Sequence, residues 1–186
     1  MMRIIAGESR GRKLRTVRRG ATRPTMDRVR ESLFAILTPW LEDCHFLDIF
    51  AGTGSVGLEA LSRGAERAVF VESNRDCASV IRENLDLMGC SDSAAVAARP
   101  WNAGLTQLSG RETFGIIFAD PPYEQEAILL KVAEEVLHRN LLVSPGWLVF
   151  QHTVRLHLPD EFGEALRRVD TRRFGETVLT FYRVAD

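Results

Sequence analysis

Cysteine is scarce in this sequence of 186 residues, and the three that occur, Cys44, Cys77 and Cys90, are odd in number and lack C-x-x-C spacing. This argues against a disulfide framework or a zinc site and indicates reduced thiols. The four histidines follow no metal-ligand spacing, so we expect no metal. No serine has a His or acidic partner suggested by its sequence context, which disfavours nucleophilic catalysis.

Long apolar runs are missing as well. No segment approaches the roughly 20 residues of a membrane span, and the N-terminus is too charged for a signal peptide. With 45% hydrophobic residues, the composition is typical of a globular protein. We therefore expect a cytoplasmic protein without a membrane partner, a monomer with a single main domain.

Acidic residues are rare at the start of the chain. Residues 1–30 contain ten Arg or Lys against Glu8 and Asp27, whereas the remaining 156 residues contain 14 basic and 23 acidic ones. A basic arm on an acidic body is typical of nucleic-acid contact, because each cation placed on a phosphate releases counterions. Two β-compatible runs, RIIAG and KLRTV, flank the turn-prone ESRGR and predict a small β-hairpin. We assign residues 1–22 to this arm and residues 23–186 to one domain.

The segment FLDIFAGTGSVG, Phe46 to Gly57, predicts a strand, a glycine-rich turn and a helix. Gly52, Gly54 and Gly57 have the spacing G-x-G-x-x-G, which lets the backbone turn tightly and approach a ligand closely. Glu72 follows at the end of the next apolar run, where an acid can bind ribose hydroxyls. The spacing therefore predicts a nucleotide-like ligand.

Asp48 narrows the choice of ligand. A carboxylate two residues before Phe50 would repel a pyrophosphate, which disfavours a dehydrogenase. The loop F-A-G-T-G resembles the first motif of S-adenosylmethionine-dependent methyltransferases, whose ligand has no phosphate. In that family the acid near the strand end faces the ammonium of the methionine half.

Strand-like and helix-like segments alternate through the rest of the chain, which predicts an α/β fold with a mostly parallel sheet. Two final strands around Gly175 predict an antiparallel hairpin. Right-handed crossovers bring the carboxyl ends of the parallel strands to one edge. One such end reads FGIIFADPPY, with Asp120, Pro121, Pro122 and Tyr123.

The D-P-P-Y turn has the composition of a site for an amino group on an aromatic ring. Two prolines remove two backbone donors and keep the chain extended, so that neighbouring carbonyls remain available as acceptors. If Asp120 and the Pro121 carbonyl accept the two N–H bonds, the nitrogen can become pyramidal and direct its lone pair at a methyl. Tyr123 would stack on the ring.

Taken with RIIAGESRGRKL and RPTMDRVRESLF, these motifs make the whole chain resemble the bacterial small-subunit ribosomal RNA guanine-N2 methyltransferases, the RsmD family. The resemblance implies a class I methyltransferase fold, Rossmann-like and doubly wound, with seven strands, an antiparallel C-terminal hairpin and the small basic arm. It also implies methyl transfer from S-adenosylmethionine, yielding S-adenosylhomocysteine, to the exocyclic amine of one loop guanine of 16S rRNA in the small ribosomal subunit.

The resemblance implies three groups of site residues. The catalytic group that holds the guanine is Asp120, Pro121, Pro122 and Tyr123. The cofactor group is Asp48, Phe50, Ala51, Gly52, Thr53, Gly54, Glu72 and Ser73. The RNA-binding group is Arg10, Arg12, Lys13, Arg15, Arg23, Arg28 and Arg30.

Two stretches depart from the family pattern. Ala98 to Trp101 follow the third strand, where an acidic or polar contact to the adenine is common, and Gln151 ends a strand where relatives often have an acid. Two other functions remain open: a DNA adenine-N6 methyltransferase, for which the chain lacks room for a recognition domain, and a non-catalytic RNA-binding ribosome-assembly factor. A glutamine methyltransferase would typically carry Asn in place of Asp120.

Overall fold

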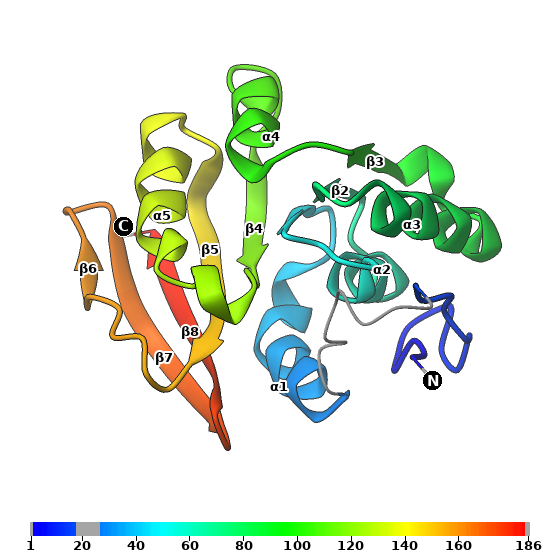
Figure 1. The fold of residues 1–186 in the computed structure, drawn as a ribbon, viewed down its shortest axis with the longest axis horizontal. Helices are drawn as coiled ribbons and strands as arrows, with labels where there is room; N and C mark the ends of the chain where they lie inside the picture. Colours follow the sequence, from blue (N-terminus) through cyan, green and yellow to red (C-terminus); the bar gives the residue numbers. More distant parts are fainter. Residues whose placement is uncertain (1, 18–26, 185–186) are drawn as a thin grey trace. The chain divides into compact units, whose positions relative to one another are not determined.

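The structure is a computed structural model that describes residues 2–17 and 27–184 (Figure 1). It divides into two compact units, residues 1–101 and residues 102–186. Helices and strands alternate through most of the chain, as the sequence predicts for an α/β protein. None of the helices among the described residues combines the length and the apolar character needed to cross a membrane. The predicted arm boundary at residue 22 lies outside the described residues.

Three parallel strands in the order β3-β2-β1 form the sheet of the first unit. Helices join successive strands, because parallel neighbours need a crossover connection. Four of the five residues in β1, and in β2, are buried, as expected for strands covered on both faces. The elements are α1 (Asp27–Leu37), η1 (Thr38–Trp40), β1 (His45–Ile49), α2 (Ser55–Ser62), β2 (Arg67–Val71), α3 (Arg75–Met88), η2 (Ser91–Ser93) and β3 (Ala94–Ala97). Helix α4 (Trp101–Leu108) begins at the last residue of this unit.

The N-terminal arm forms a hairpin closed by one antiparallel bridge between Arg3 and Lys13. The Ile4 amide donates to the Arg12 carbonyl at 3.0 Å, and the Leu14 amide donates to the Met2 carbonyl at 3.0 Å. The predicted hairpin is therefore present, although its two sides are too short for a regular ladder. Ile4 and Leu14 are buried, which shows that the arm belongs to the core of the first unit.

The carboxylate of Glu59, in α2, fastens the arm to the body of this unit. It accepts hydrogen bonds from the backbone amides of Ile5 at 2.8 Å and Ala6 at 3.0 Å. The arm comes so close that a Cβ added at Gly7 would lie 1.7 Å from the Ser62 carbonyl oxygen. Glycine is therefore required at this position, where φ is +84°.

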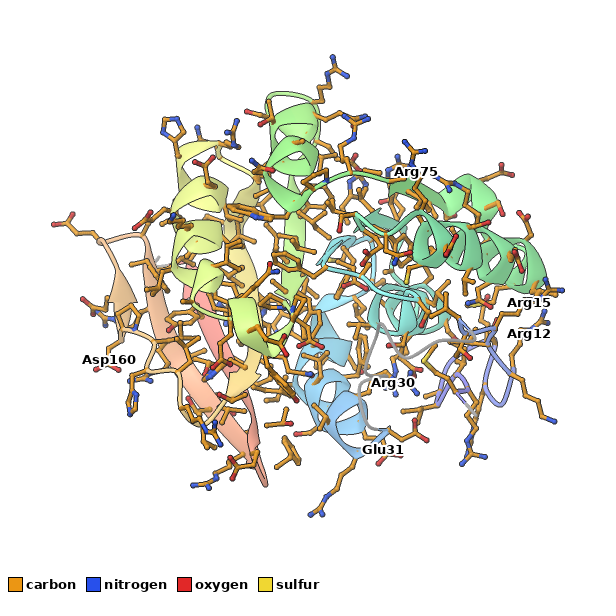
Figure 2. All side chains as sticks on the ribbon, in the orientation of Figure 1. Arg12, Arg15, Arg30, Glu31, Arg75 and Asp160 are labelled. Atoms are coloured by element: carbon orange, nitrogen blue, oxygen red, sulfur yellow. The ribbon has the colours of Figure 1, made fainter. Side chains whose placement is uncertain are left out.

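Helix α3 holds the other end of the arm. The Asn84 side chain accepts a hydrogen bond from the Arg15 amide at 2.8 Å and donates one to the Arg15 carbonyl at 3.2 Å. Arg15 also forms an ion pair with Glu83, and Arg12 donates to the Leu87 carbonyl (Figure 2). Because these contacts involve residues on two helices, the arm is a packed part of the unit.

Five strands in the order β4-β5-β8-β7-β6 form the sheet of the second unit. Strands β4 and β5 are parallel, and β8, β7 and β6 add to them in antiparallel fashion. The β7–β8 hairpin is the one predicted around Gly175. The elements are β4 (Phe114–Ala119), η3 (Tyr123–Gln125), α5 (Ile128–His138), β5 (Leu142–Thr153), β6 (Glu161–Phe162), β7 (Leu166–Phe174) and β8 (Thr177–Val184).

The described residues contain eight strands, so the predicted number of seven is wrong. The additional strand is β6, which has only two residues and pairs with the start of β7. Such a short strand leaves no alternation of apolar and polar residues for sequence analysis to detect. Phe162 at its end nevertheless packs edge-on against Tyr182, with ring centroids 5.1 Å apart.

Candidate functional site

The predicted cofactor loop lies in the first unit, between the carboxyl end of β1 and the start of α2. Phe50, Gly52 and Gly54 have φ values of 62°, 55° and 82°, in the left-handed region. Glycine adopts this region without strain, whereas Phe50 adopts it at a cost of about 1–3 kcal/mol. Strain of this kind is concentrated at functional sites such as ligand-binding turns, so the predicted role of the loop stays a prediction that this geometry permits.

Gly57 packs the start of α2 directly against β2. A Cβ at this position would lie 2.4 Å from Cε1 of Phe70, a buried ring on β2. The third glycine of the G-x-G-x-x-G spacing therefore serves close helix–strand packing. The same residue donates its backbone N–H to Asp48 Oδ2 at 2.9 Å.

Asp48 is a buried carboxylate at the end of β1, with 2% of its surface exposed. Desolvation raises its pKa to about 7; the hydrogen bond from Gly57 opposes this shift, and the nearby charge of Glu72 adds to it. Asp48 thus has one hydrogen-bond donor and a like charge nearby. A cation brought to this position would relieve both the desolvation and the repulsion.

Glu72 connects the end of β2 to the glycine loop. Its Oε2 accepts the Gly52 N–H at 2.7 Å, and its Oε1 accepts the Asn74 N–H at 2.7 Å. A carboxylate has about four lone-pair positions, so both oxygens retain capacity for further donors. The structure therefore brings the predicted acid into direct contact with the predicted loop, 20 residues earlier in the chain.

The other predicted cofactor residues lie in the same part of the first unit. Ala51 donates its N–H to the Val71 carbonyl at 3.1 Å, Thr53 is buried within the loop, and Ser73 is exposed directly after Glu72. Trp101, at the start of α4, lies with its ring centroid 6.4 Å from that of Phe50. An aromatic pair therefore adjoins the loop, which is more than sequence analysis assigned to Trp101.

The D-P-P-Y turn lies in the second unit, directly after β4. Pro121 is buried, Asp120 and Tyr123 are half-buried, and Pro122 is exposed with an extended conformation (φ −52°, ψ 142°). The Pro122 carbonyl accepts the Gln125 N–H at 2.8 Å. Among the described residues, none donates a hydrogen bond to the Pro121 carbonyl. That carbonyl is the acceptor that the sequence predicts for an amine.

Two hydrogen-bonded contacts hold this turn against the end of β5. Gln151 donates its Nε2–H to Asp120 Oδ2 at 2.8 Å. Glu126 accepts the Thr153 backbone N–H at 2.8 Å and the Thr153 hydroxyl at 2.7 Å. Sequence analysis left Gln151 without a role and missed the Glu126–Thr153 contact. The register between β4 and β5 would have revealed the Gln151 contact. Ala119 of β4 pairs with Phe150 of β5, and Asp120 and Gln151 are the residues that follow them.

The predicted RNA-binding residues separate into three kinds. Arg10, Lys13 and Arg28 are exposed, and Arg12 and Arg15 are exposed while also contacting α3. Arg23 lies outside the described residues. The prediction that Arg30 contacts RNA has to be corrected. Its side chain is 0% exposed and donates to the Arg3 carbonyl at 2.7 Å and to Asp27 at 3.0 Å (Figure 2). A guanidinium buried in this way has no surface to offer a phosphate.

Titratable side chains do not gather into a metal site in the described part of the chain, where no group of three His, Cys, Asp or Glu residues could hold an ion. The two motifs are thus each assembled within a unit. One is a glycine loop with two acids, and the other is an Asp-Pro-Pro-Tyr turn braced by Gln151.

Known proteins resemble this chain over most or all of its length. The structure resembles that of a putative methyltransferase, YhhF from Escherichia coli, with a TM-score of 0.88 and 29% identity over 100% of this chain and 98% of the other. The chain is 34% identical over 186 residues to the putative rRNA methyltransferase YlbH of Bacillus subtilis, covering 98% of each sequence. It is 37% identical to ribosomal RNA small subunit methyltransferase D of Haemophilus influenzae, covering 82% of this chain and 78% of the relative.

These likenesses define the class: the chain has the Rossmann-like α/β fold of the class I methyltransferases, with an antiparallel C-terminal hairpin. The family model described as Conserved hypothetical protein 95 matches residues 2–183. The chain belongs to that family, the RsmD family, as its sequence motifs predict.

Proposed function

We propose that this protein transfers a methyl group from S-adenosylmethionine to the exocyclic N2 amine of a guanine in small-subunit ribosomal RNA. The observation that carries the proposal is the turn Asp120–Tyr123, with a carboxylate held by Gln151 and a proline carbonyl beside it, in a chain of the RsmD family. The curated relatives that carry the name ribosomal RNA small subunit methyltransferase D support the RNA substrate.

The residues of the first unit fit S-adenosylmethionine. Asp48 is a carboxylate whose pKa is raised mainly by burial, and the ammonium of the cofactor would supply a counter-charge that stabilises its ionised form. Glu72 retains lone pairs for ribose hydroxyls, and the strained loop from Phe50 to Gly54 allows close backbone approach. When bound, the cofactor supplies a methyl on a sulfonium, whose sulfur keeps the electron pair of the broken bond.

The residues of the second unit would prepare the amine. The guanine amine is planar because its lone pair is delocalised into the ring. Hydrogen bonds from its two N–H groups to Asp120 and to the Pro121 carbonyl would favour a pyramidal nitrogen with a directed lone pair. As the nitrogen gains the methyl it gives up one proton along the hydrogen bond to Asp120, and Tyr123 would stack on the ring, worth about 1–3 kcal/mol. Positioning supplies most of the rate.

The exposed cations of the arm would bind RNA phosphates. Arg10 and Lys13 are exposed on a hairpin that Glu59 and Asn84 hold in place, so little ordering entropy is lost when RNA binds. Arg12, Arg15 and Arg28 extend the same proposal to neighbouring exposed positions, and Arg23 remains part of it from sequence alone. Arg30 is excluded by its burial.

The test is transfer of tritiated methyl from S-adenosylmethionine to unmodified small subunits, to naked 16S rRNA and to unmethylated DNA, followed by nucleoside analysis. We expect N2-methylguanosine from a ribosomal substrate. Label in N6-methyladenine of DNA would identify a DNA adenine methyltransferase instead. Binding of the cofactor and of RNA without transfer to any substrate would favour a non-catalytic assembly factor.

A substitution at the turn separates chemistry from cofactor binding. We expect Asp120→Asn to lower kcat by at least about 100-fold, in line with the loss of a well-positioned acceptor, with an unchanged affinity for the cofactor. The matched control Asp92→Asn changes an exposed aspartate of η2 and is expected to leave both quantities unchanged. Loss of cofactor affinity in Asp120→Asn would contradict the role assigned to this residue.

A further inference from the structure

We infer that Gln151 is a positioning residue for the reaction: its side-chain amide fixes the orientation of the Asp120 carboxylate that receives the base amine. The inference rests on the proposed function, because it assigns a role within the same turn. It concerns a residue for which neither the glycine loop nor the D-P-P-Y motif predicts a role.

The first argument is geometric. Gln151 follows Phe150, which pairs with Ala119, so Gln151 lies laterally beside Asp120 at the carboxyl ends of β4 and β5. On its other side β5 is paired with β8, where Gln151 is opposite Leu179. A strand with neighbours on both sides holds the Gln151 backbone rigidly. Its Nε2 therefore reaches Asp120 Oδ2 at 2.8 Å from a fixed base.

The second argument comes from the other end of the amide. Gln151 is only 6% exposed, and among the described residues nothing donates a hydrogen bond to its Oε1. A buried acceptor without a partner destabilises the folded chain. An apolar side chain of similar size would avoid that cost. The Gln151 amide therefore destabilises the folded chain, and we attribute its presence to the hydrogen bond that it makes to Asp120.

The direction of the hydrogen bond fits an ionised Asp120. An ionised carboxylate is an acceptor only, so the amide must present its N–H to it. A carboxylate has about four lone-pair positions, and the bond to Gln151 uses one of them. The bond to Gln151 does not by itself prevent an amine from donating to the same carboxylate. The bond restricts rotation of the carboxyl group.

The other titratable groups of this turn and of the β5 end are Tyr123, the exposed Glu124, Glu126 and His152. Glu126 is bonded to Thr153. His152 Nδ1 lies 2.7 Å from the Thr153 carbonyl and its Nε2 lies 2.8 Å from Thr180 Oγ1. Because a carbonyl only accepts, Nδ1 carries the proton, and burial lowers the pKa of His152. These contacts hold Glu126 and His152 in roles separate from the Gln151 amide.

The experiment compares two substitutions with matched controls at Gln107, an exposed residue of α4. Gln151→Leu removes the donor, and Gln151→Glu replaces it with a like charge of the same shape. Gln107→Leu and Gln107→Glu introduce the same side chains on the surface. For each protein we would measure kcat and KM on unmodified small subunits, cofactor affinity, the pH dependence of kcat and the melting temperature.

We expect Gln151→Leu to lower kcat about 10- to 100-fold, as for a loosened catalytic group, while cofactor affinity stays within about twofold and the melting temperature does not fall. In Gln151→Glu the acid limb of the kcat profile should move to higher pH, because a neighbouring carboxyl makes ionisation of Asp120 harder. The Gln107 variants should match the parent protein. A residue with only a structural role would lower the melting temperature and leave the pH profile unchanged.

The inference is overturned if Gln151→Leu keeps kcat within about twofold of the parent and Gln151→Glu keeps its pH profile. A parent protein that forms no N2-methylguanosine would instead refute the proposed function. In that case the carboxyl carbon of Asp120, titrated by NMR without substrate, still decides the matter. The pH midpoint of this chemical-shift titration should be higher in Gln151→Leu than in the parent, because the variant lacks the N–H that donates to the carboxylate. An equal midpoint would refute the role of Gln151.

Discussion

The carboxylate of Glu59 should be one of the most important single groups for the stability of the first unit. It is fully buried and receives the amides of Ile5 and Ala6, the Nε–H of Arg63 at 2.7 Å, and the field of Arg30, whose Nε lies 3.9 Å from Oε2. Glu59→Gln keeps the shape of the side chain but removes its charge and one of its two acceptor oxygens. Arg30 would then be a buried cation with a weaker counter-charge.

The expected loss can be estimated from these contacts. Removing one partner of a buried ion pair costs about 3–5 kcal/mol, and Arg30 would keep only the exposed carboxylate of Asp27, at 3.0 Å, as a counter-charge. Burial already lowers the pKa of Arg30, a direction that Glu59 opposes. Domains of this size are stable by about 5–15 kcal/mol, so Glu59→Gln should remove at least about a fifth of the free energy of unfolding. The melting temperature should fall by roughly 6–20 °C.

Urea titration followed by circular dichroism measures this loss, and hydrogen exchange at the Ile5 and Ala6 amides reports whether the arm has left α2. The double variant Arg30→Met/Glu59→Gln is the control. It should be more stable than Glu59→Gln alone, because no buried guanidinium then lacks a counter-charge. A loss below about 1 kcal/mol, with unchanged exchange at both amides, would refute the role given to Glu59.

Three further predictions concern the cofactor loop and the arm. Burial raises the pKa of Asp48 from 3.8 to about 7, so in this pH window the folded chain holds a proton that the unfolded chain has lost, and stability falls as pH rises through it. Asp48→Asn removes this pH dependence. The difference in free energy of unfolding between the variant and the parent, measured by urea titration, should therefore shift by about 3 kcal/mol in favour of the variant from pH 5 to pH 8. The affinity of the variant for the cofactor should fall. Gly57→Ala places a Cβ 2.4 Å from Phe70 Cε1 and should destabilise the chain by about 1–3 kcal/mol despite the better helix propensity of alanine; equal or greater stability in urea would contradict the packing argument. Replacing Arg10 and Lys13 by Gln should reduce the steepness of the fall of log association constant for RNA with log salt concentration by roughly 1.5. An unchanged slope would show that neither residue contacts the RNA.

Features encoded by neighbouring residues were predictable from the sequence. The strand, turn and helix of FLDIFAGTGSVG follow from apolar runs and glycine spacing, and they are found as β1, the loop and α2. The weak third strand is found as β3 (Ala94–Ala97), and the final hairpin as β7 and β8. Glu72, which the sequence predicts at the end of the next strand as an acid for ribose hydroxyls, also contacts the glycine loop.

Features that depend on distant partners were not predictable. Arg30 reads as a surface cation because arginine is rarely buried and Arg28 and Glu31 lie beside it in sequence, and only α2, 29 residues later, supplies the buried Glu59 that accounts for it. Gln151 reads as the last residue of a strand, and its role depends on the register between β4 and β5. Local periodicity contains no information about either pairing.

The attachment of the arm also sets an order of events during synthesis of the chain. Arg15 is bonded to Asn84, which lies 69 residues later, so this part of the arm is translated well before its partner. At about 5–20 residues per second, roughly 3–14 seconds separate the translation of these two partners. Throughout that interval the Arg15 end of the arm lacks its binding surface on α3, and its arginines are accessible to trypsin-like proteases.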